Sequence, residues 1–110
     1  MVYFVGAGPG ATDLITVRGL KLLQEADIVV YAGSLVNPEL LKETKKTCEI
    51  YNSAVMTLEE VIAVLKRSAS EQKQIVRLHT GDPSIYGAVK EQMDELERIG
   101  VLYEVCQNDC

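Results

Sequence analysis

The stretch Val2–Gly10, VYFVGAGPG, joins an apolar run to a cluster of glycines and decides the fold class. A run of consecutive apolar residues that stops at glycine is typical of a strand buried on both faces. Similar short runs occur at Ile28–Tyr31, Cys48–Tyr51 and Ile75–Leu78, and Val101–Val105 alternates as a last strand. Strands buried on both faces occur mainly in parallel sheets that helices cover.

Segments with helical periodicity alternate with these strands. The pattern predicts helices over Thr16–Ala26, Leu58–Ala69 and Ser84–Ile99, and Gly100 is expected to end the last one. Thr57-Leu58-Glu59-Glu60 fits a capping box at the start of the second helix. Asn37-Pro38-Glu39 indicates a further helix start, with Asn at the cap and Pro in the first turn.

This alternation predicts an α/β fold with an open, mostly parallel sheet and helices on both faces. We expect Val2–Val5 and Ile75–Leu78 to be central strands because both runs are predominantly apolar. A chain of 110 residues fits one domain, and the sequence contains neither an internal repeat nor a linker. Ligands of such sheets bind beyond the carboxyl ends of the strands, which directs attention to the loops at 6–13, 32–37 and 80–87.

Composition narrows the classes of partner. The net charge is −5 and the pI is about 4.8, which argues against a broad nucleic-acid-binding surface. The amino-terminal apolar run ends at Gly6, too early for a signal peptide or a membrane span, so we expect a cytoplasmic protein without a membrane partner. The three cysteines form no CxxC pair, so we expect free thiols and no metal site.

The first loop, Gly6-Ala7-Gly8-Pro9-Gly10, resembles a dinucleotide fingerprint but departs from it. Its third glycine arrives one residue early, and Pro9 lacks a backbone donor. The fingerprint also needs an acid after the second strand, whereas Glu25 and Asp27 precede that strand and Ala32-Gly33-Ser34 follows it. NAD binding is therefore disfavoured. From spacing alone, a tight turn and a ligand-binding loop remain equally good interpretations.

The third loop, His79 to Gly87, has a structural and a functional interpretation that can both hold. Asp82 can cap the following helix with Pro83 in its first turn, and the residues alone favour this interpretation. Gly81 also allows a ligand to approach the backbone closely. The lone His79 is interpreted as a packed residue and Tyr86 as a wall. No nucleophile–base pair or carboxylate dyad is visible, so the catalytic residues are unknown.

Three segments in these loops resemble the tetrapyrrole (corrin/porphyrin) methylases. They are Val5–Gly10 with Leu14-Ile15-Thr16 after it, Ala26–Tyr31 and Gly81–Gly87. Each segment is weak alone, but the three in this order are specific. Tyr31–Pro38 and Leu78–Ser84 resemble the precorrin-4 C-11 methyltransferases within that family. Diphthine synthase and the ribosomal-RNA ribose methylases share the first loop more loosely.

The resemblance implies a methyltransferase that uses S-adenosyl-L-methionine. It implies C-methylation of precorrin-4 or cobalt-precorrin-4 at C-11 in cobalamin biosynthesis, with a tetrapyrrole as the small-molecule substrate and a homodimer as the assembly. By the same resemblance, Pro9, Thr80, Gly81, Asp82 and Ile85 bind the cofactor, and Ser34 faces the substrate.

The resemblance extends to Val105 and then fails. Family members continue into a second α/β domain, and this chain reads CQNDC over residues 106–110 and stops. We therefore expect residues 1–110 to be the amino-terminal domain, without the second domain that completes the cofactor cleft. Two alternatives stay open: a non-enzymatic fragment or interaction module of the same fold, and a related methylase that acts on diphthamide or RNA.

Overall fold

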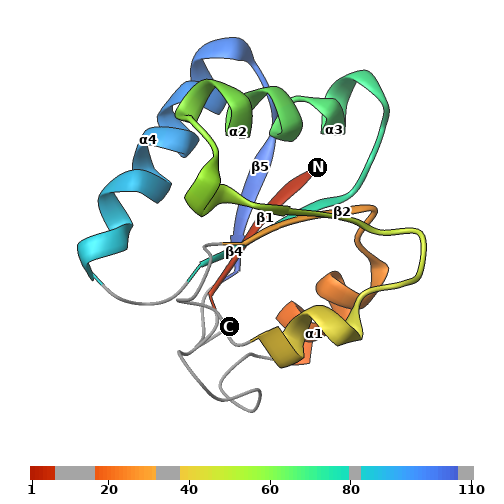
Figure 1. The fold of residues 1–110 in the computed structure, drawn as a ribbon. Coiled ribbons are helices and arrows are strands. Elements are labelled where there is room, and N and C mark those ends of the chain that lie inside the picture. Colours follow the sequence, from red (N-terminus) through yellow and green to blue (C-terminus); the bar gives the residue numbers. More distant parts are fainter. Residues whose placement is uncertain (7–16, 32–37, 80–82, 107–110) are drawn as a thin grey trace.

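The computed structural model of the chain describes residues 1–6, 17–31, 38–79 and 83–106 (Figure 1). Within these ranges the side chains of residues 38–40, 83–88 and 106 are not described.

The strands of the described part form one sheet in which every pairing is parallel. Their order across the sheet is β3-β2-β4-β1-β5. The strands are β1 (Val2–Gly6), β2 (Ile28–Tyr31), β3 (Glu49–Asn52), β4 (Ile75–His79) and β5 (Tyr103–Cys106). The prediction that Val2–Val5 and Ile75–Leu78 are central strands is confirmed, because β4 is the middle strand and β1 lies beside it.

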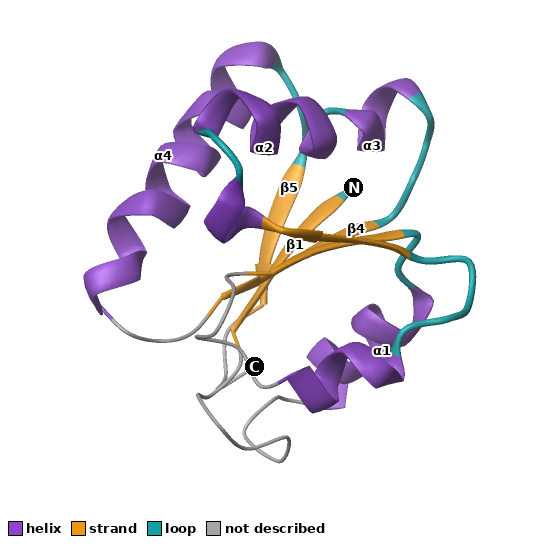
Figure 2. Ribbon diagram, in the orientation of Figure 1, coloured by secondary structure: helices purple, strands orange, loops and turns teal. Residues whose placement is uncertain are grey.

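Helices connect the strands and cover both faces of the sheet (Figure 2). The α-helices are α1 (Val17–Glu25), α2 (Leu58–Leu65), α3 (Arg67–Ser70) and α4 (Pro83–Ile99), and two 3₁₀ helices are η3 (Pro38–Glu43) and η4 (Ser53–Val55). Figure 1 shows α1 on one side of the sheet and α2, α3 and α4 on the other. The predicted α/β fold with helices on both faces is confirmed.

Alternate residues of the strands pack into two separate cores, one on each face of the sheet. Phe4, Val30 and Ile75 point toward α2 and α4 and are buried with Val61 and Leu96 of those helices. The strand residues between them, Val5, Val29, Val76 and Leu78, point toward α1 and form the second core with Leu23 and Ala26. Because both faces of each inner strand are buried, these strands read as mostly apolar runs, with Arg77 of β4 as a charged exception.

The helix boundaries follow the signals in the sequence at two places. The Thr57 hydroxyl accepts from the Glu60 backbone N–H and the Glu60 carboxylate accepts from the Thr57 N–H, so the predicted capping box is present. At the end of α4, Gly100 has a φ of 79°, and Val101 N–H donates to the Leu96 carbonyl. This left-handed glycine ends the helix as predicted, because other residues adopt that conformation at a cost.

Four predicted elements differ from the structure in continuity, type or starting residue. The helix predicted over Leu58–Ala69 is interrupted at Lys66, whose ψ of −12° breaks the helical repeat between α2 and α3. The helix predicted at Asn37-Pro38-Glu39 is the 3₁₀ helix η3. The third strand starts one residue later than predicted and the last strand two residues later. In both cases the apolar stretch begins before the first residue that pairs with a neighbouring strand.

Asp27 ties together the amino ends of three strands. Its Oδ1 accepts from Lys45 Nζ at 2.7 Å, and its Oδ2 accepts from the Gln74 backbone N–H at 2.9 Å. Its own backbone N–H donates to the Gln74 carbonyl, and its carbonyl accepts from the Glu49 N–H. The hydrogen bonds from Lys45 and Gln74 lower the pKa of the Asp27 carboxyl. Asp27 therefore holds the start of β2 against the starts of β4 and β3.

We expect Asp27→Asn to lower the free energy of unfolding by about 1 kcal/mol at pH 7, because charge-assisted hydrogen bonds are lost. Since folding lowers the pKa of Asp27, its contribution is complete well above the unfolded value of about 3.9 and disappears as the pH falls through the folded value. Urea unfolding from pH 7 to pH 3 should show the two proteins converging at acidic pH. Glu25→Gln, at an exposed carboxylate nearby, is the control and should stay within about 0.5 kcal/mol.

Candidate functional site

The carboxyl ends of β1, β2 and β4 lie side by side at one edge of the sheet. Gly6 at the end of β1 is in register with His79 at the end of β4, and Tyr31 at the end of β2 is in register with Leu78. The segments 7–16, 32–37 and 80–82 leave from these three strand ends. The structure therefore brings together the starting points of the three loops that the sequence singles out.

The helices that follow β1 and β4 lie on opposite faces of the sheet. The chain passes from β1 to α1 on one face and from β4 to α4 on the other, although β1 and β4 are neighbours (Figure 2). In open parallel sheets, two such neighbouring strands leave a crevice between their diverging connections, and ligands bind there. The candidate site is accordingly the edge between Gly6 and His79. Sequence periodicity alone does not reveal this point, because it depends on the strand order.

Five of the six residues predicted to bind cofactor or substrate lie outside the described residues: Pro9, Ser34, Thr80, Gly81 and Asp82. The sixth, Ile85, belongs to the start of α4, and its side chain is not described. Their roles stay predictions. The structure does describe the residues that flank them, namely Gly6, Tyr31, His79 and the helix start at Pro83.

His79 ends β4 at the candidate site and is partly buried, with its Nε2 atom shielded from solvent. Because side chains alternate along a strand, His79 lies on the same face of β4 as Arg77 and Ile75. The partial burial agrees with the interpretation of His79 as a packed residue.

Arg77 is a buried cation that sequence reasoning missed within an apolar strand. Its side chain lies under α4, where Nε donates to Gln92 Oε1 at 2.9 Å and Nη1 donates to the Leu78 carbonyl at 2.6 Å. Arg77 is 2% exposed and Gln92 is 5% exposed. Burial lowers the pKa of Arg77 to about 10, so the guanidinium remains charged at neutral pH. The signal was present in the sequence as one charged residue in Ile75–His79 and one amide on the inner face of α4.

The described residues offer neither a metal centre nor a membrane span. Among them, no group of three or more His, Cys, Asp and Glu side chains could hold a metal ion. None of the described helices is long and apolar enough to cross a bilayer.

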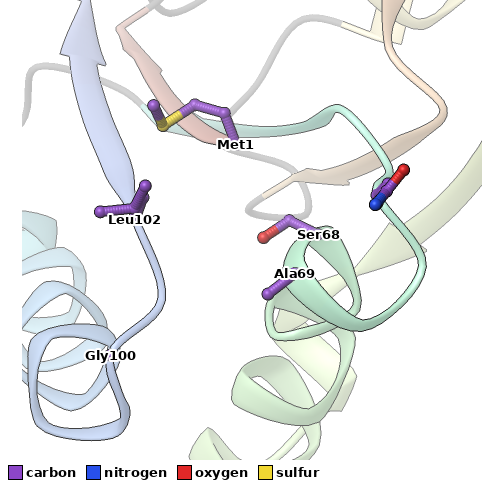
Figure 3. Close-up of a pocket in the computed structure, with 6 residues that line it drawn as sticks. Met1, Ser68, Ala69, Gly100 and Leu102 are labelled. Atoms are coloured by element: carbon purple, nitrogen blue, oxygen red, sulfur yellow. The ribbon is translucent and has the colours of Figure 1, made fainter.

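A hollow of about 420 Å³ lies at the opposite, amino-terminal edge of the sheet (Figure 3). It is bordered by Met1, Ser68, Ala69, Gln72, Gly100 and Leu102. The Ser68 Oγ atom is buried there without a hydrogen-bond partner in the described part of the chain. The hollow borders the starts of β1 and β5, so it is distinct from the candidate site at the carboxyl ends of the strands.

Comparison with known proteins identifies relatives along nearly the whole chain. A cobalt-precorrin-4 C(11)-methyltransferase of Methanocaldococcus jannaschii is 58% identical over 104 residues, which are 94% of this chain and 40% of the relative. A protein of the same name from Priestia megaterium is 51% identical with the same coverage. The precorrin-4 C(11)-methyltransferase of Rhodococcus erythropolis is 46% identical and is 42% covered. The chain thus spans about two fifths of the length of these relatives.

Solved structures share the fold. The X-ray structure of a cobalt precorrin-4 methyltransferase superposes with a TM-score of 0.86 at 51% identity, covering 94% of this chain and 44% of that chain. A uroporphyrin-III C-methyltransferase from Thermus thermophilus, complexed with S-adenyl homocysteine, gives a TM-score of 0.75 at 35% identity and covers 96% and 43%. The sequence profile of the tetrapyrrole (corrin/porphyrin) methylases matches residues 1–106. The chain therefore belongs to the tetrapyrrole methylases.

Proposed function

We propose that the protein to which this chain belongs transfers a methyl group from S-adenosylmethionine to C-11 of cobalt-precorrin-4 in cobalamin biosynthesis. The observation that carries this proposal is the 58% identity to a relative named for that reaction. The relatives named for precorrin-4 without cobalt are 42–46% identical, which favours the cobalt-containing substrate. Precorrin-4 is the second candidate substrate, and the same assay distinguishes the two.

The chain supplies one side of the cofactor site in this proposal. The edge between Gly6 and His79 suits a ligand because the helices that follow β1 and β4 lie on opposite faces of the sheet and because Gly6 has no side chain there. We place the cofactor against Pro9, Thr80, Gly81, Asp82 and Ile85, and the tetrapyrrole against Ser34. The S-adenyl homocysteine complex of the Thermus relative supports the choice of cofactor. The part of the relatives that this chain does not span would supply the second domain and the other side of the cleft.

When bound, S-adenosylmethionine supplies an electrophilic methyl group on a positively charged sulfur. The methyl would pass from that sulfur, which would be left as a neutral thioether, to the ring carbon, which would give up a proton. The ring carbon is electron-rich through conjugation with the pyrrolic nitrogens. The residues of this chain are therefore needed to align the two reactants and exclude water, rather than to act as a strong base.

A hybrid protein tests the activity. Residues 1–105 of this chain replace the aligned stretch of the Methanocaldococcus jannaschii relative, and mass spectrometry follows methyl transfer to cobalt-precorrin-4. We expect the hybrid to add one methyl group and the 110-residue chain alone to add none, because the chain offers one side of the cleft. A hybrid that folds and binds S-adenosylhomocysteine but methylates neither tetrapyrrole would contradict the proposed reaction. Activity of the chain alone would contradict the need for a second domain.

Asp82→Ala in this hybrid separates cofactor binding from helix capping. Loss of a helix cap alone costs about 1 kcal/mol of stability. Loss of a hydrogen-bonding group in a desolvated cleft costs about 1 to 3 kcal/mol of binding free energy. We expect calorimetric titration with S-adenosylmethionine to show weaker binding, with a smaller effect on thermal melting. Asp82→Asn is the matched control, because Asn also caps helices. Unchanged affinity of Asp82→Ala with a clearly lower melting temperature would mean that Asp82 is only a cap.

We also propose that the chain acts in the cytoplasm and self-associates as a homodimer. The homodimer is what the family resemblance implies. Val17 at the start of α1 and Val55 at the end of η4, which are 87% and 81% exposed, are apolar side chains that a partner could cover. In sedimentation velocity of the 110-residue chain, the fraction of dimer should rise with protein concentration. A monomer at every concentration would contradict the homodimer.

A further inference from the structure

The hollow at the amino-terminal edge of the sheet lies between the ends of two helices and the starts of two strands (Figure 3). α3 contributes Ser68 and Ala69 to its lining, and Gly100 directly follows the end of α4. Met1 and Leu102 precede β1 and β5. Each segment that the structure does not describe follows the carboxyl end of a strand, at the opposite edge. The walls named here therefore come from residues whose positions are described.

Backbone hydrogen bonds hold the rim of the hollow in place at Met1 and Leu102. The Met1 carbonyl accepts from the Ile75 N–H at 3.2 Å, and the Leu102 carbonyl accepts from the Val2 N–H at 3.3 Å. The amino group of Met1 donates to the Lys73 carbonyl at 3.4 Å. The volume of about 420 Å³ falls within the range of small-molecule sites, which is about 300 to 1,000 Å³. The hollow is thus a preformed space of a suitable size for a small ligand.

Ser68 supplies this hollow with a buried hydroxyl that lacks a partner. The residue is 4% exposed, and its Oγ atom makes no hydrogen bond in the described part of the chain. Figure 3 shows the hydroxyl directed from α3 toward the side of the hollow where Leu102 lies. A buried hydroxyl without a partner is uncommon and lowers stability. One rotation about the Cα–Cβ bond moves a serine hydroxyl between staggered positions, so it can meet a polar group that enters the hollow.

Gln72 lines the same hollow in a strained backbone conformation. Its φ of 54° lies in the left-handed region, which glycine adopts freely and other residues adopt at a cost. Gln72 directly follows Glu71, the C-cap of α3, and glycine is the usual residue at that position. This sequence has a carboxamide side chain there instead. Strain that persists beside a cavity points to a use for the side chain that causes it.

The lining suits an uncharged ligand with an apolar part and a polar part. Met1 and Leu102 are apolar residues that are 42% and 74% exposed. The Ser68 hydroxyl and the Gln72 carboxamide can each both donate and accept a hydrogen bond. None of the side chains named in this lining is charged, and the amino group of Met1 donates to a backbone carbonyl. A charged ligand would lose hydration here without gaining an opposite charge.

We propose that this hollow is a second ligand-binding site, which takes a small uncharged molecule whose apolar group carries a carboxamide or a hydroxyl. The apolar group packs between Met1 and Leu102. The polar group gives Ser68 the partner that it lacks and bonds to the Gln72 carboxamide. This proposal does not rest on the proposed function, because the hollow lies at the edge of the sheet opposite to the candidate site.

Benzamide is the probe for this site, because it joins an apolar ring to a carboxamide. In an amide NMR titration of the 110-residue chain, we expect saturable shift changes at about millimolar concentration. The changes should occur at the backbone amides of Ala69, Gln72, Gly100 and Leu102. Benzoate has nearly the same shape but carries a charge, and it should bind at least about tenfold more weakly. Absence of saturable changes with benzamide, or equal binding of benzoate, would overturn the proposal.

Substitutions in α3 separate binding from stability. Ser68→Ala removes the hydroxyl and should weaken benzamide binding about threefold to tenfold. Its melting temperature should stay the same or rise, because no hydrogen-bond partner is lost. Ala69→Leu places a larger side chain in the hollow and should abolish saturable binding with little effect on melting, since Ala69 is exposed. Ser70→Ala is the matched control, because Ser70 is exposed on the same helix and does not line the hollow.

Gln72→Gly should also bind benzamide more weakly while its melting temperature stays the same or rises, because glycine adopts the left-handed conformation freely. Full affinity of Ser68→Ala or of Ala69→Leu would overturn the proposal, since the probe would then bind elsewhere. Shift changes confined to Gly6 and His79 would overturn it as well, because they would place benzamide at the other edge of the sheet.

Discussion

The parallel pairing of every strand in the described sheet is the constraint on which the rest of the structure depends. Parallel neighbours cannot be joined by a tight turn, so a helix or a long connection must return the chain across the sheet each time. Those connections cover both faces, which buries the inner strands and separates the two cores. The same constraint gathers the carboxyl ends of β1, β2 and β4 at one edge, where the chain can vary without disturbing either core.

The two edges of the sheet use charged groups differently. At the amino edge, charges are paired with opposite charges: Lys45 with Asp27, and Arg67 with Glu49. These pairs join neighbouring strands and helices and are partly exposed to solvent. Arg77, which reaches toward the carboxyl edge, is instead buried with neutral partners in the described part of the chain. These two ion pairs thus lie at the edge of the sheet opposite to the candidate site.

The sequence contained most of the architecture and less of the site. Apolar runs such as Ile28–Tyr31 revealed the buried strands, because burial on both faces leaves no alternation to misinterpret. Thr57 and Gly100 marked helix ends, because the hydrogen-bonding and conformational reasons for those residues are local. Strand order is not local, so the position of the candidate site between the ends of β1 and β4 required the structure. Arg77 was overlooked because a single charged residue in an apolar run shows no periodicity. Its hydrogen bond to Gln92 on α4 becomes visible only in the structure.

The position of β1 between β4 and β5 has a consequence for synthesis of the protein on the ribosome. β1, the first of these strands to be made, pairs with β4 and β5. It does not pair with β2 or β3, which are made before β4. β1 must therefore wait, with its apolar residues exposed, until some seventy further residues have been made, which takes several seconds at about 5 to 20 residues per second. During that interval β2 and β3 can already pair, whereas the amino-terminal strand remains available to chaperones or to another nascent chain.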